Sequence, residues 1–177
     1  GVNTSNALLP GTVMLFNGGT YPATNGSSAL TLNNGQGVFG MNANYSALAS
    51  GAARSTFNGA FILNGNNTLD SIILNDSLGA TTTAITSTGG QNLILNNMII
   101  GNSDTPYGVV MNLVNASAAL TQSIAFASGQ NSTSTLLTQG ISLAGSSLLV
   151  QSSSINVVNV SSNVNPDAIF VNGSTLQ

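Results

Sequence analysis

Few side chains in this sequence could perform acid–base or metal chemistry. Its charged residues are Arg54, Asp70, Asp76, Asp104 and Asp167, and His, Lys, Glu and Cys are absent. Asp70 and Asp76 are six residues apart, so they could act as a carboxylate pair in glycoside chemistry. With Asn oxygens they could instead bind calcium. Without a basic helper, we prefer the simpler interpretation that both cap turns, and we expect no catalytic residue, bound metal or cofactor.

A second group of residues could contact a ligand. Arg54 could bind an acidic sugar, although a local salt bridge or solvation explains a single cation more simply. Tyr21, Tyr45 and Tyr107 could stack on sugar rings, but scattered tyrosines more often serve packing. These four residues are the ligand-binding candidates. Asp104 and Asp167 are each next to or near a proline, and we interpret them as turn residues.

The composition favours a structural or binding role over catalysis. About half of the residues are Asn, Gly, Ser or Thr, and only 3% are charged, against about 25% in ordinary domains. With a net charge of −3, the chain lacks the basic patch that nucleic acid or an anionic membrane surface requires. No apolar run approaches the length of a spanning helix, so we expect no membrane insertion by this segment.

Apolar residues recur with a period of about 25 residues, a spacing typical of solenoid repeats. Ile73, Ile99 and Ile124 illustrate it, at intervals of 26 and 25 residues. Three such series are predicted to point into the core: Phe61, Leu63, Ile85, Met111, Leu113, Ile141 and Leu143; Leu69, Leu93, Leu95, Leu120, Leu148 and Val150; and Ile73, Ile99, Ile124, Ile155 and Val157. The six phenylalanines are expected to join them, and Ile99→Asp is expected to be severely destabilising.

These series predict an all-β fold, a right-handed parallel β-helix. It would hold about seven rungs of roughly 25 residues, each with three short strands. We expect one domain over residues 1–177, with loop excursions near 42–56 and 128–135. Asn and Gly, which tolerate left-handed backbone, would form the corners, and stacked Asn side chains would bond along them. An antiparallel sandwich or jelly roll also uses many short strands, but the repeat favours the solenoid.

Two segments near the N-terminus carry a family resemblance. GTVMLFNGGTY at 11–21 is followed by LTLNNGQGVFG at 30–40. This order resembles the opening rungs of pectin-lyase-like β-helices, especially the passengers of bacterial autotransporter and invasin-like surface proteins. Lyases of that superfamily use clustered acidic calcium ligands with Arg or Lys, and its hydrolases use grouped Asp residues with His, Arg or Lys. Neither set can be mapped onto this sequence.

The expected function is therefore a non-enzymatic extracellular or cell-surface module, acting as an adhesin passenger, a stalk or a surface-fibre building block. Its partners would be a glycan or a host or matrix ligand. The alternative is a polysaccharide-binding or polysaccharide-degrading β-helix. The uncharged strand pattern at 169–177 also predicts end-to-end self-association or an adjacent domain, and the absence of an initiator Met suggests a fragment or processed product.

Overall fold

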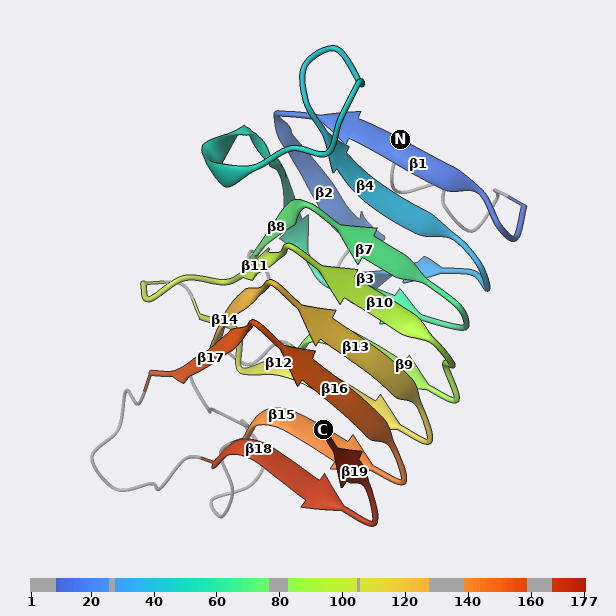
Figure 1. Ribbon diagram of the computed structural model, residues 1–177, viewed down its shortest axis with the longest axis vertical. Helices are drawn as coiled ribbons and strands as arrows, with labels where there is room; N and C mark the ends of the chain where they lie inside the picture. The colour runs from blue at the N-terminus through green and yellow to red at the C-terminus, as the bar shows by residue number, and fades with distance from the viewer. Residues whose placement is uncertain (1–8, 26–27, 77–82, 105, 128–138, 159–166) are drawn as a thin grey trace.

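The chain folds into a parallel β-solenoid with three faces (Figure 1). The computed structural model describes residues 9–25, 28–76, 83–104, 106–127, 139–158 and 167–177. Face A is a sheet of β1 (Val13–Asn17), β4 (Gly37–Met41), β7 (Thr68–Asp70), β10 (Leu93–Asn96), β13 (Ser117–Thr121), β16 (Ser147–Gln151) and β19 (Thr175–Leu176). Its strands are all parallel and follow one another along the long axis of the molecule.

The other two faces contribute the second and third strand of each coil. Face B holds β2 (Thr20–Asn25), β5 (Ser55–Gly59), β8 (Ile72–Asn75), β11 (Ile99–Ile100), β14 (Ile124–Ala127) and β17 (Ser154–Val157). Face C holds β3 (Ser28–Leu32), β6 (Phe61–Leu63), β9 (Thr83–Thr88), β12 (Val109–Val114), β15 (Gln139–Ala144) and β18 (Asp167–Asn172). The two faces are joined at the first coil, where β2 and β3 pair antiparallel.

The coils are longer and fewer than the sequence period predicted. Each turn takes about 28 residues rather than about 25, and about five regular turns are present rather than seven. The regular coils run from β4–β6 to β16–β18, preceded by the irregular first coil and followed by β19. One cause is the excursion between β4 and β5, which includes the short 3-10 helix η2 (Gly51–Ala53) and lengthens that coil. The predicted excursion at 128–135 lies outside the described residues.

The first two apolar series form the core as predicted. Their members on faces C and A are buried, from Phe61 to Leu143 and from Leu69 to Leu148, and only Val150 near the last coil is half-buried. Repeating apolar positions at the same place in successive coils therefore stack into continuous internal columns. This packing of one coil on the next is what a solenoid needs for stability.

The third series is wrong by one residue over most of its length. Ile73, Ile99 and Ile124 do stack in register, but they face outward, and Ile124 is 45% exposed. The inward column on face B is instead Leu74, Ile100 and Ala125, all fully buried and likewise in register. A shift of one residue moves every side chain of a strand to the other face of the sheet.

The aromatic side chains also divide between the interior and the surface. Phe57 and Phe61 are fully buried, and Phe16 packs on the core with its ring centroid 5.0 Å from that of Phe57. The expectation that all six phenylalanines belong to the core is wrong for Phe39, Phe126 and Phe170. These three are half-buried on outward strand positions, where they are aligned with polar residues of the next or previous coil.

The corners between the faces use left-handed backbone, as the abundance of Asn and Gly predicted. Between faces C and A the corner column is Gly89, Asn115, Gly145 and Gly173, with φ from 50° to 73°. Between faces A and B it is Ser71, Asn97, Gln122 and Ser152, with φ from 50° to 57°. In both columns the corner amides above the last coil bond to the coil below, as in Asn97 N to Thr121 O at 2.9 Å. Serine and glutamine also occupy corners, for which the composition predicts only Asn and Gly.

Candidate binding face

The two central acidic candidates do not form a carboxylate pair. Asp70 ends β7 on the outer side of face A and is only 8% exposed. Its Oδ1 accepts a hydrogen bond from Ser71 Oγ at 2.8 Å, and its Oδ2 accepts one from Asn96 Nδ2 at 3.0 Å. Asp76 instead follows β8 on face B, where its charge acts on Tyr107. The structure thus gives Asp70 a structural role in stacking β7 on β10.

Tyr107 belongs to the interior rather than to a sugar-binding surface. Its side chain is fully buried, and its hydroxyl donates a hydrogen bond to Gly59 O at 2.5 Å. Burial, and secondarily the negative charge of Asp76, raises the pKa of the Tyr107 hydroxyl far above its ordinary range. A neutral hydroxyl is the form that can donate to a buried carbonyl, so Tyr107 fixes the chain before β12 to β5.

The other two tyrosines lie in different settings. Tyr21 is half-buried, and its ring centroid lies 4.8 Å from that of Phe16 and 5.5 Å from that of Phe57. It therefore serves packing at the first coil. Tyr45 is 48% exposed in the excursion after β4 and has a φ of 57°. Of the three tyrosines, Tyr45 alone presents much of its ring to solvent.

Arg54 fastens the excursion between β4 and β5 to a corner of the solenoid. Its Nη2 donates to Oδ1 of Asn97, so the hydrogen-bond partner is an amide rather than a carboxylate. Asn97 Nδ2 donates in turn to Ser71 Oγ at 2.8 Å and to Ala49 O at 3.4 Å. One amide on the corner column thus links the excursion to the coil above.

This cluster predicts a difference between two corner residues with the same backbone conformation. Asn97 and Gln122 have φ values of 50° and 51°, but among the described residues only the Asn97 side chain of the two forms hydrogen bonds. We expect Asn97→Ala to lower the free energy of unfolding by about 2 kcal/mol and Gln122→Ala to change it by less than about 0.5 kcal/mol. Urea denaturation of both variants measures this; equal losses would contradict a specific role for Asn97.

The remaining two acidic residues, Asp104 and Asp167, lie in a bend and at the start of a strand. Asp104 is exposed in a bend where its backbone N–H donates to Asn102 Oδ1 at 2.8 Å. Asp167 begins β18, so its assignment to a turn is wrong. Across the described ranges, no three His, Cys, Asp or Glu side chains gather closely enough to hold a metal ion. Nor does any helix in those ranges have the length and apolar character needed to cross a membrane.

Polar side chains form hydrogen-bonded ladders along both borders of face A. At one border, Asn34 Oδ1 accepts from Asn66 Nδ2 at 3.0 Å, and Asn66 Oδ1 accepts from Asn92 Nδ2 at 3.2 Å. This ladder confirms the predicted bonding between stacked Asn side chains. At the other border, Thr121 Oγ1 donates to Asn96 Oδ1 at 2.8 Å, which continues the ladder from Asp70.

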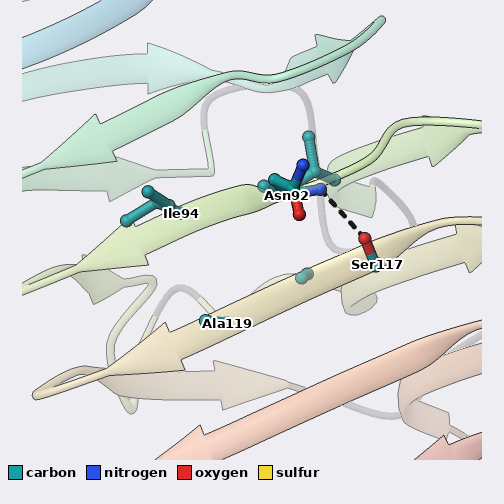
Figure 2. A pocket seen from close by; sticks show the side chains of 6 residues that line it. Asn92, Ile94, Ser117 and Ala119 are labelled. Carbon is teal, nitrogen blue, oxygen red and sulfur yellow. Dashed lines mark hydrogen bonds between the residues drawn. The ribbon is translucent and has the colours of Figure 1, made fainter.

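Between these ladders the outer side of face A is hollowed over β13. Ala119 lies in register between Ile94 on β10 and Leu149 on β16, which are 46% and 39% exposed. A hollow of about 320 Å³ adjoins Ile94, Ser117 and Ala119. Figure 2 shows these residues on the two neighbouring strands. A second hollow, of about 280 Å³, adjoins Asn96, Thr121, Gln122, Gln151 and Ser152. The two hollows are separate, and both lie along the outer side of β13; we call this strip of face A the β13 groove.

The residues of the β13 groove are not among those predicted from the sequence, although the outward positions of β13 carry a signal for it. The outward residues of β13 are Ser117, Ala119 and Thr121, whereas Ala118 and Leu120 point inward and are buried. Small outward residues on one strand between larger ones on its neighbours produce a depression. Finding it requires the correct strand alignment between coils, which the residue types alone do not provide. No protein-family model, curated protein or solved structure significantly matches this chain.

Proposed function

We propose that the chain is a non-catalytic β-solenoid module of the extracellular space or cell surface, which holds an uncharged binding surface at a distance from its attachment point. The observation that carries this proposal is the outer side of face A. There, amide and hydroxyl side chains form ordered ladders, and the acidic residue among them, Asp70, is engaged in hydrogen bonds. Such a surface suits adhesion to a glycan or matrix ligand.

The same proposal includes the finer family assignment. The two N-terminal motifs, now placed on β1 to β4, support a relation to pectin-lyase-like passengers of autotransporter or invasin-like proteins. The long stack of parallel strands suits a stalk or fibre element, since each coil adds backbone hydrogen bonds to the last. Extracellular location follows from the adhesive role proposed here.

Two assays on the same protein, one of binding and one of turnover, separate adhesion from catalysis. We expect the chain to bind glycan- or matrix-coated surfaces with little change between low and high salt, because few charges contribute to contact. We expect no turnover of polygalacturonate or related polysaccharides. Asp70→Asn and Asp76→Asn serve as controls in both assays. Turnover that either substitution abolishes would overturn the non-catalytic part of the proposal. Failure to bind any surface in the panel would overturn its adhesive part.

A further inference from the structure

We infer that the β13 groove binds a short segment of an uncharged oligosaccharide. This inference rests on the proposed adhesive function and names the place and the ligand class through which it would act. The groove follows β13 across face A. A five-residue strand spans about 16 Å at about 3.3 Å per residue, which is enough for a short saccharide segment.

The chemistry of the lining changes along the groove. Its middle is apolar, with the methyl group of Ala119 between Ile94 and Leu149. One end holds Asn92 and Ser117, which are joined by a 2.9 Å hydrogen bond from Asn92 N to Ser117 Oγ. An apolar centre with a few polar groups at its ends is the usual composition of a small-ligand site. A sugar ring offers the matching surfaces, C–H groups on its faces and hydroxyl groups at its edge.

The opposite end supplies amide groups that can reach a ligand. Gln151 and Gln122 are exposed, and within the part of the chain that the structure describes their side-chain amides make no hydrogen bonds. Each amide offers two N–H donors and one acceptor oxygen, which can pair with adjacent hydroxyl groups. Polar atoms that already bond to each other are not available to a ligand. The amides of Gln122 and Gln151 are available, so this end of the groove can form hydrogen bonds with a ligand.

Charge decides which saccharides fit. Neither hollow has a charged residue in its lining. Asn96, at the edge of the groove, donates a hydrogen bond to Asp70 of the coil above it. A carboxylate on the saccharide would therefore lie near an existing negative charge. Burying an unpaired charge is unfavourable. The groove therefore favours neutral sugars over uronates.

The test uses calorimetric titration of the whole chain with neutral tetrasaccharides of glucose, mannose and N-acetylglucosamine, and with tetragalacturonate. Ala119→Trp would fill the groove, and we expect it to weaken binding of the preferred neutral probe at least tenfold. Ser142→Trp is the matched control because Ser142 occupies an outward position on β15, in face C. We expect Ser142→Trp to change affinity less than twofold. Gln151→Ala is expected to weaken binding at least threefold with an unchanged Tm.

The results separate this inference from the proposed function. Tighter binding of tetragalacturonate than of any neutral probe would overturn the inference, as would unchanged affinity in both Ala119→Trp and Gln151→Ala. If the chain adheres to protein-coated surfaces but binds no saccharide, the groove assignment fails while the adhesive function stands. If it adheres to nothing, both fail.

Discussion

Replacing Ile100 by aspartate is expected to unfold the solenoid. Ile100 is fully buried on β11, in register between Leu74 of the coil above and Ala125 of the coil below. An aspartate there would place a carboxylate in an apolar column with no cation facing it. We expect a loss of more than about 4 kcal/mol, which is a large part of the total stability of an ordinary domain.

The neighbouring Ile99→Asp variant is the control. Ile99 is half-buried on the outer side of the same strand, between Ile73 and Ile124. Its aspartate can reach water, so we expect a loss of about 1 kcal/mol, and the severe destabilisation predicted from the sequence pattern is wrong for this residue. Circular dichroism melts suffice, since each kcal/mol moves the Tm of a chain this size by about 2–4 °C. Equal losses, or a larger loss for Ile99→Asp, would contradict the inward placement of Ile100.

The same pair of residues shows why the sequence predicts this fold better than its strand alignment. Composition and a repeating apolar spacing indicate stacked coils, because only stacking buries such short strands. The spacing from Leu95 to Ile99 crosses a corner, however, and Asn97 occupies that corner with left-handed backbone. A corner residue belongs to neither strand, so the inward-outward alternation restarts after it. Residue types on the two strands cannot show where it restarts.

The binding face was harder to predict than the core. Charged and aromatic residues are the usual markers of a site, and here Asp70, Arg54 and Tyr107 stabilise the fold. The β13 groove instead depends on three neighbouring strands, and it exists because Ala119 is smaller than its neighbours Ile94 and Leu149. Those residues are separated by 25 and 30 positions in the chain. Their alignment follows from coil lengths that vary with each excursion, not from local sequence.

The close approach of two coils at a corner gives the second large expected effect. Gly40 on β4 lies beside the corner residue Ser71, whose φ of 57° turns the chain from face A to face B. A Cβ atom at position 40 would overlap the carbonyl oxygen of Ser71 and lie 2.9 Å from its carbonyl carbon. Both are backbone atoms, fixed by the corner conformation and by the coils on either side. The obstacle therefore cannot be removed by a side-chain rotation.

We therefore expect Gly40→Ala to lower the free energy of unfolding by about 3 kcal/mol, the upper end of the usual cost of overpacking. Gly37→Ala is the matched control on the same strand. Its Cβ would lie 2.7 Å from Cε2 of Phe39, and that half-buried ring can move outward, so we expect less than about 1 kcal/mol. Urea denaturation compares the two variants under identical conditions. Because both substitutions remove the same backbone entropy from the unfolded chain, the difference between them measures how closely β4 packs on the Ser71 corner, and a difference near zero would show that the corner can yield.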